Sequence, residues 1–222
     1  MRTLTKADQQ LLTPQKALDI LKEGNKRFVN NIKLNRNLLQ QVNETSEGQF
    51  PFAIILSCID SRTSAELIFD QGLGDIFSVR IAGNIVNDDI IGSMEFACEI
   101  AGSKLIVVLG HKNCGAIKGA CHNVKLGKLT SLLNKITPAI EEVRQLCASA
   151  ENGDIVEKVA TANVLIGMKN IREQSPLLNE MIESGKIGLV GAKYDVETGE
   201  VRFYENMETE YEALCSGVNM KK

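Results

Sequence analysis

Apolar residues along the chain fall into two alternating patterns. Short continuous apolar runs are typical of buried strands, and they occur at 52–57, 76–81, 104–109 and 187–194. Between and beyond these runs, apolar residues recur at helical spacing, which predicts helices at 65–71, 88–101, 114–122, 128–149, 154–173 and 177–184. Strands that alternate with helices predict a parallel sheet with right-handed crossovers.

The chain before the first strand is helical but largely polar. Thr13-Pro14 provides an N-cap residue and a proline for the first turn, which predicts a helix continuing to about residue 30. The stretch 31–50 is rich in Asn and Gln and predicts a short helix or an extended arm. An isolated amphipathic arm cannot bury its own apolar side, so we expect it to dock on a partner subunit.

The last predicted strand leads into a turn, Glu197-Thr198-Gly199-Glu200, and then into an apolar run at 201–204. This order predicts a hairpin, which adds one antiparallel strand to the sheet. We therefore predict a single α/β domain over residues 1–222, with a mostly parallel central sheet flanked by helices. Its parts are an N-terminal helical arm at 1–50, an α/β core at 51–205 and a C-terminal tail at 206–222.

The overall composition excludes some classes of partner. A formal charge of −3 is too small to favour nucleic acid or an anionic membrane. No apolar run approaches the roughly 18 residues of a membrane span, and the first residues lack the apolar core of a secretory signal. We therefore expect a cytoplasmic protein whose six cysteines are free or metal-bound rather than disulfide-bonded.

Candidate chemistry is concentrated in two short peptides that directly follow predicted strands. Cys58-Ile59-Asp60-Ser61-Arg62 follows the first strand, and His111-Lys112-Asn113-Cys114 follows the third. Parallel strands bring their carboxyl ends to one edge of a sheet, so we expect the two peptides to lie close together. Thiolate, imidazole and carboxylate groups are the ligands that Zn²⁺ prefers, and the sequence therefore predicts a zinc site at this edge.

Asp60 determines which kind of zinc site this is. As a fourth protein ligand it closes the site, whereas a pair with Arg62 leaves the fourth position open for water. Three protein ligands and an open position are typical of catalytic zinc, which lowers the pKa of a bound water from 15.7 toward about 7. The spacing of Asp60 and Arg62 at a strand end suits such a pair, but both alternatives remain open at this point.

The two peptides together resemble the β-class carbonic anhydrases. The matching pattern is Cys58-x-Asp60-Ser61-Arg62 followed by His111-x-x-Cys114-Gly115. The similarity covers most of the chain and includes further stretches at 23–28, 74–77, 82–84 and 191–195, with Arg80 and Thr198-Gly199. The resemblance implies reversible hydration of CO₂ to bicarbonate, by hydroxide on a zinc ion that Cys58, His111 and Cys114 hold. It further implies an Asp60–Arg62 dyad and a site in a cleft between subunits, hence a homo-oligomer of at least two copies.

The resemblance also implies residues that bind substrate. Gln49 matches a glutamine that contacts substrate in the plant-like branch of the family, and Phe77 and Phe96 match aromatic positions of its CO₂ pocket. Another branch has an inhibitory bicarbonate site around a tryptophan three residues before the first cysteine. Ile55 stands at that position and the chain has no Trp, so we expect no such site.

Two departures from the family pattern have simple expected effects. Thr63 and Ser64 replace a common Val-Pro pair, and we expect a hydroxyl there to cap the following helix. Ser78 replaces an apolar residue, and we expect it to affect packing only.

Two other functions are compatible with the same motifs. One is hydrolysis of COS or CS₂ on the same scaffold, since such relatives retain much of the zinc site. The other is a non-enzymatic zinc-stabilised or redox-sensing module that uses the same thiols. The pairing of Asp60 with Arg62 argues against the module, because a purely structural site has no need of it.

Overall fold

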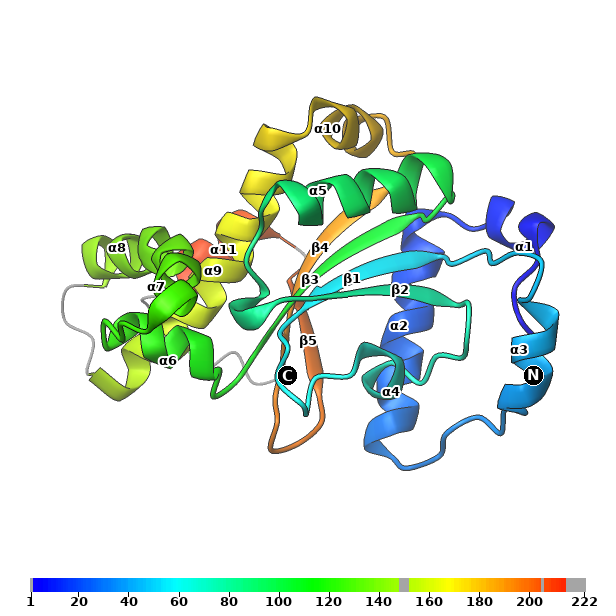
Figure 1. Cartoon of the computed structure of the whole chain (residues 1–222), viewed down its shortest axis with the longest axis horizontal. Coiled ribbons are helices and arrows are strands. Elements are labelled where there is room, and N and C mark those ends of the chain that lie inside the picture. Colours follow the sequence, from blue (N-terminus) through cyan, green and yellow to red (C-terminus); the bar gives the residue numbers. More distant parts are fainter. Residues whose placement is uncertain (1, 148–151, 205, 215–222) are drawn as a thin grey trace.

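The computed structural model describes residues 2–147, 152–204 and 206–214. Within these residues, five strands form one sheet in the order β2-β1-β3-β4-β5 (Figure 1). Their bounds are β1 Ala53–Ser57, β2 Ile76–Arg80, β3 Leu105–His111, β4 Gly188–Tyr194 and β5 Val201–Tyr204. The first four strands are parallel to their neighbours and β5 is antiparallel to β4. The predicted fold class is confirmed.

Helices cover both faces of the sheet (Figure 1). Every residue of β1 and β3 is buried, as expected of central parallel strands with both faces covered. Alternate side chains enter two different apolar layers, because successive residues of a strand point to opposite faces. Ile54 and Leu56 pack with one cluster of buried side chains, whereas Ala53 and Ile55 pack with another.

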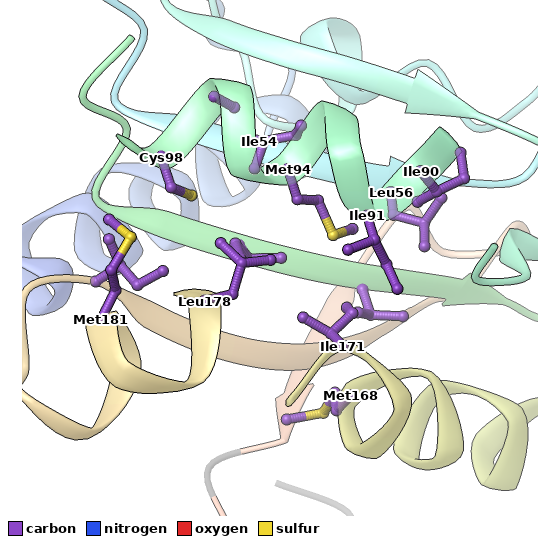
Figure 2. Close-up of a cluster of buried hydrophobic side chains, with 14 of the residues drawn as sticks. Ile54, Leu56, Ile90, Ile91, Met94, Cys98, Met168, Ile171, Leu178 and Met181 are labelled. Carbon is purple, nitrogen blue, oxygen red and sulfur yellow. The ribbon is translucent and has the colours of Figure 1, made fainter. Parts of the chain in front are cut away.

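The first of these layers lies under three helices, α5 Asp88–Glu95, α9 Asn152–Gln174 and α10 Pro176–Glu183. Figure 2 shows Met94 of α5, Ile171 of α9 and Leu178 of α10 among the side chains that fill it. The opposite layer is covered by α2 Pro14–Val29 and the short helix α4 Ala65–Ile68. Thr13 caps α2 and accepts a hydrogen bond from the amide of Lys16, as its sequence predicts.

The N-terminal arm contains more helix than its polar sequence indicates. The predicted short helix is α3 Leu38–Glu44, but α1 Lys6–Gln10 was not predicted. Thr5 and Asp8 form a capping box that begins α1. The side-chain amide of buried Gln9 donates to the carbonyl oxygens of Pro51 and Ala101. A helix so short has no apolar stripe to reveal it, so its tertiary contacts stabilise it instead.

The predicted helix 128–149 is interrupted in the structure. Its described part divides into α7 Gly127–Leu133, a 3₁₀ turn at Asn134–Ile136 and α8 Thr137–Leu146; residues 148 and 149 lie outside the described part. Pro138 lies in the first turn of α8, where its missing N–H costs nothing. The apolar residues keep helical spacing across this break, so the pattern predicted one helix, although Pro138 marks the start of the second.

The remaining helical segments differ from the prediction in smaller ways. The predicted helix 88–101 changes after α5 into a π-helical turn at Phe96–Ile100, and Ala82–Asn84, where no helix was predicted, forms a 3₁₀ turn. The predicted helix 114–122 is α6 Gly115–Cys121, as expected. A further helix, α11 Met207–Ala213, lies in the segment that we predicted only as a tail.

The cysteines are not all free, contrary to expectation. Cys58, Cys98, Cys114 and Cys121 have free thiols, but Cys147 is in a disulfide. Within the described residues, we find no helix with both the length and the apolar character that crossing a membrane requires.

Candidate functional site

Cys58, His111 and Cys114 meet at the carboxyl edge of the sheet. Cys58 follows β1 directly and His111 is the last residue of β3, and these strands are parallel neighbours. One ligand atom from each residue lies within 4.8 Å of the other two, and the sulfur atoms of Cys58 and Cys114 are 3.9 Å apart. All three side chains are buried, with 1–4% of each residue exposed. The structure thus brings together the three predicted ligands, although Cys58 and Cys114 are 56 positions apart in the sequence.

The geometry of this cluster fits a tetrahedral metal ion. Two sulfurs bound at about 2.3 Å to one zinc at a tetrahedral angle lie about 3.8 Å apart, close to the distance between Cys58 and Cys114. His111 Nδ1 lies 3.0 Å from the carbonyl oxygen of Lys112, so Nδ1 carries the proton. Nε2 of His111 is buried without a hydrogen-bond partner, and its lone pair is available to a metal. These residues can therefore hold a metal ion.

The thiols of Cys58 and Cys114 are within hydrogen-bond distance of each other. A hydrogen bond from Cys114 is the main cause that lowers the pKa of Cys58 to about 4, against the effect of burial, and the amide of Gly83 adds to it at 3.3 Å. The same contact with Cys58, together with burial, raises the pKa of Cys114. A cation that binds both sulfurs displaces the thiol proton, because both sulfurs must be thiolates to act as ligands.

Asp60 does not join this cluster but pairs with Arg62. Arg62 donates from Nε to Oδ1 of Asp60 at 2.9 Å and from a terminal nitrogen to Oδ2 at 2.8 Å, and its backbone amide donates to Oδ1 at 3.0 Å. The side-chain hydrogen bonds from Arg62 are the largest cause that lowers the pKa of Asp60 well below its usual range. Both carboxylate oxygens accept hydrogen bonds from Arg62, and Asp60 is not part of the group of converging ligand atoms.

The backbone of the first peptide is clamped by two residues whose roles the sequence analysis missed. The hydroxyl of Thr63 donates to the carbonyl oxygens of Cys58 and Asp60, both at 2.9 Å. Arg80, at the end of β2, donates to the same two carbonyls at 3.1 and 2.6 Å. Arg80 lies in a stretch that resembles the family, but nothing in the sequence indicated what it contacts.

The departures from the family pattern therefore have different effects from those expected. Ser64 occupies the N-cap position of α4 without a capping hydrogen bond, so our capping prediction was wrong. Thr63 instead fastens the ligand peptide. Ser78 donates to Glu66 at 2.6 Å and is a polar link between β2 and α4 rather than a packing change.

A family model described as carbonic anhydrase matches residues 53–201, a span that contains both ligand peptides. The chain belongs to the carbonic anhydrase family. Carbonic anhydrase 2 of Mycobacterium tuberculosis is 34% identical over 194 residues, which cover 84% of this chain and 90% of that protein. A carbonic anhydrase of Mycolicibacterium smegmatis is 31% identical over 200 residues, covering 87% and 95%.

Solved structures place this carbonic anhydrase in the β class. The β-carbonic anhydrase CafA of Aspergillus fumigatus is 27% identical, with a TM-score of 0.69 over 90% of this chain and 95% of that chain. A tetrameric β-carbonic anhydrase of Sordaria macrospora is 26% identical, with a TM-score of 0.65 over 72% and 84%. Family, relatives and fold agree on reversible hydration of CO₂ to bicarbonate, and none of them favours the COS or CS₂ alternative.

The predicted substrate residues lie away from Cys58, His111 and Cys114 of their own chain. Gln49 is exposed and precedes β1, at the opposite edge of the sheet from Cys58. Phe77 of β2 pairs in register with Ile54 near the start of β1, and its ring contacts that of Phe96 edge-on, with centroids 6.3 Å apart. Both rings line a groove of about 580 Å³ between β2 and α5, and Phe96 is 55% exposed.

Proposed function

We propose that Cys58, His111 and Cys114 hold the zinc ion of this carbonic anhydrase, and that Asp60 and Arg62 are its catalytic dyad. The observation that carries this proposal is that the three ligand residues converge on one another, whereas Asp60 is bound by Arg62. Three buried ligand atoms converge within 4.8 Å, while both oxygens of the nearby Asp60 are bound by Arg62. Zinc with three protein ligands supplies a water of lowered pKa as nucleophile for CO₂.

The chain's own residues then have distinct tasks. Asp60 retains acceptor capacity beside the metal cluster, because each carboxylate oxygen can accept a further hydrogen bond. It can thereby orient the attacking oxygen toward CO₂, while Arg62 keeps the carboxylate charged and out of the coordination sphere. A carboxylate released from Arg62 can instead become a fourth ligand, which corresponds to a closed, inactive state.

We infer that the working form is a homo-oligomer in which Gln49, Phe77 and Phe96 serve the site of a second copy. Gln49 precedes β1, Phe77 pairs with Ile54 near the start of β1 and Phe96 contacts Phe77, whereas Cys58 follows the end of β1. The arm also presents exposed apolar side chains on α3, where Leu38 is 56% exposed and Leu39 71% exposed. A tetrameric relative supports association of this kind.

We further infer that the chain belongs to the plant-like branch and lacks a regulatory bicarbonate site. Ile55 stands at the tryptophan position, and it is fully buried in the apolar layer under α2 and α4. Simple, non-cooperative inhibition by bicarbonate is expected; steep cooperative inhibition contradicts this inference. The division into arm, core and tail within one domain and a cytoplasmic location stay predictions.

Stopped-flow measurement of CO₂ hydration on zinc-loaded protein tests the proposal. Cys58→Ser should lose zinc and activity together, whereas Asp60→Asn should keep zinc and lose most of its activity. A wild-type rate no higher than that of either variant contradicts the proposed site. Zinc binding without hydration activity supports the non-enzymatic module instead.

A further inference from the structure

We propose that Glu157 is a positioning residue for the metal centre, which holds the loop between His111 and Cys114 in the geometry that a metal requires. This inference rests on the zinc site proposed above. Glu157 lies on α9, outside every motif that pointed to the site, and 44 residues from the loop that it contacts. Its effect acts through the backbone and not through contact with substrate.

The contact is a direct hydrogen bond to the loop backbone. The amide of Asn113 donates to Oε1 of Glu157 at 3.0 Å, immediately before Cys114 in the chain. Asn113 adopts a left-handed conformation with φ of 58°, which asparagine tolerates better than most residues other than glycine, so the loop turns sharply just before Cys114. A bond to a charged acceptor is stronger than one to a neutral acceptor, so Glu157 stabilises the turn that aims Cys114 at His111.

Glu157 is itself held by a lysine from the neighbouring strand. Its Oε2 lies 2.8 Å from Nζ of Lys193 on β4, and the same Nζ donates to the backbone carbonyl of Glu157 at 3.1 Å. The side chains are only 29% and 22% exposed, so water screens this pair less than a surface pair. Lys193 is in register with Gly110, one residue before His111, and so links α9 to the strand that carries the ligand.

The loop is anchored differently on its other side. The amide of Lys112 donates to the carbonyl of Tyr194 at 2.9 Å and so continues the β3–β4 ladder by one residue. The ladder positions His111, but it ends before Asn113. Beyond the ladder, Glu157 holds the backbone of Asn113, and Nζ of Lys118 donates to the side-chain oxygen of Asn113 at 2.9 Å.

Both ligand peptides are thus held through hydrogen bonds to their backbones. Thr63 and Arg80 bind the carbonyl oxygens around Cys58, and Glu157 binds the amide next to Cys114. Residues that orient metal ligands in this way affect metal affinity, and their loss costs about 10- to 100-fold.

The experiment compares zinc affinity in three variants of Glu157, by competition with a chromophoric chelator. Glu157→Ala should weaken zinc binding by about 10- to 100-fold. Glu157→Gln keeps an oxygen that accepts the Asn113 amide but loses the ion pair with Lys193, so it should lose less zinc affinity than Glu157→Ala. Glu157→Met keeps the side-chain length without an acceptor, and it replaces the alanine variant if that variant does not fold.

Two further measurements separate positioning from general stability. The charge-transfer absorption of the Co²⁺-substituted protein reports thiolate geometry, and it should shift in Glu157→Ala and Glu157→Met but not in Glu157→Gln. Glu173→Ala is the matched control, because Glu173 also lies on α9 and forms an exposed ion pair with Lys169. This control should bind zinc like the wild type.

The outcomes distinguish this inference from the proposed zinc site. Wild-type zinc affinity and an unchanged cobalt spectrum in both Glu157→Ala and Glu157→Met overturn the role of Glu157 and leave the site intact. Equal losses in the glutamine and methionine variants also overturn it, because the acceptor oxygen is then irrelevant. Failure of the wild-type protein to bind zinc at all overturns the proposed site itself.

Discussion

Arg62 holds Asp60 by both carboxylate oxygens, two residues after a buried cysteine of the metal cluster. In the proposed zinc site, this pairing is what would separate an open fourth position from a closed site with four protein ligands. The side chain of Asp60 is 18% exposed and that of Arg62 49% exposed, whereas Cys58, His111 and Cys114 are buried. The relationship makes Arg62 the first residue to test.

Replacement of Arg62 by alanine should lower CO₂ hydration at neutral pH by about 10- to 100-fold, since a freed Asp60 can close the metal site. Stability should change by less than about 1 kcal/mol because the pair is partly exposed. The measurement is stopped-flow hydration, with X-ray absorption to count ligands on zinc. An unchanged rate with three protein ligands contradicts the gating role of Arg62.

Removal of the metal by a chelator should abolish activity and lower the melting temperature. Two thiols 3.9 Å apart and a buried, unpartnered Nε2 of His111 then remain without their common partner. Added Zn²⁺ should restore both properties, and Mg²⁺ should restore neither, because Mg²⁺ prefers oxygen ligands. Full stability in the metal-free protein contradicts this expectation.

Acid should weaken the anchoring of the N-terminal arm through Asp70. This buried carboxylate lies 2.5 Å from Arg27 and 2.6 Å from Arg36, and its side chain is 3% exposed. Burial acts to raise the pKa of Asp70, but hydrogen bonds from Arg27 and Arg36 overcome it and the pKa is lowered. A lowered pKa stabilises the fold fully above the unfolded value of about 3.9, and this stabilisation is lost as pH falls through the folded value.

Urea unfolding of wild type and Asp70→Asn between pH 7 and pH 3 measures this contribution. Loss of one partner from a buried ion pair costs about 3–5 kcal/mol, so the variant should be less stable by up to that amount at pH 7. The difference should shrink as pH falls below about 3.9, where Asp70 of the unfolded wild-type chain takes up a proton. A difference that stays constant with pH shows that the charge of Asp70 is not responsible.

Two helical glycines should respond in opposite ways to alanine. A Cβ at Gly24 of α2 would lie 1.8 Å from the backbone oxygen of Phe69, whereas a Cβ at Gly92 of α5 meets no atom within 4 Å. Gly24→Ala should therefore separate α2 from α4 and cost more than the 1–3 kcal/mol typical of overpacking. Gly92→Ala should be neutral or stabilise by about 0.5–1 kcal/mol. Thermal denaturation of the two variants measures both effects, and similar melting temperatures contradict the close approach at Gly24.

A charge on the outer face of the arm should disrupt the oligomer. Leu39 of α3 is 71% exposed, so Leu39→Glu should leave the fold of each chain intact. If Gln49 and the phenylalanines serve a second copy, dissociation should lower activity together with the oligomeric state. Sedimentation velocity and hydration assays at the same protein concentration check this. Full activity in a monomeric variant contradicts the shared site.

Some contacts could not be read from sequence because they join distant segments. The apolar run at 105–109 predicted β3, but no pattern indicated that Glu157 would reach Asn113 from α9. A surface-type residue on an amphipathic helix has no periodicity that reveals its partner. The same holds for Thr63, whose hydroxyl has local capping partners in principle but binds the carbonyls behind it.

The sequence by itself predicted the candidate ligand set and its place at one edge of the sheet. Alternation of strands and helices predicts a parallel sheet, and a parallel sheet brings the residues after β1 and β3 to the same edge. Only the tertiary structure decided that Asp60 turns to Arg62, and that Gln49, Phe77 and Phe96 lie away from their own cluster. The reason is that strand order follows from backbone periodicity, which is local, whereas the direction of a polar side chain depends on partners that folding brings to it.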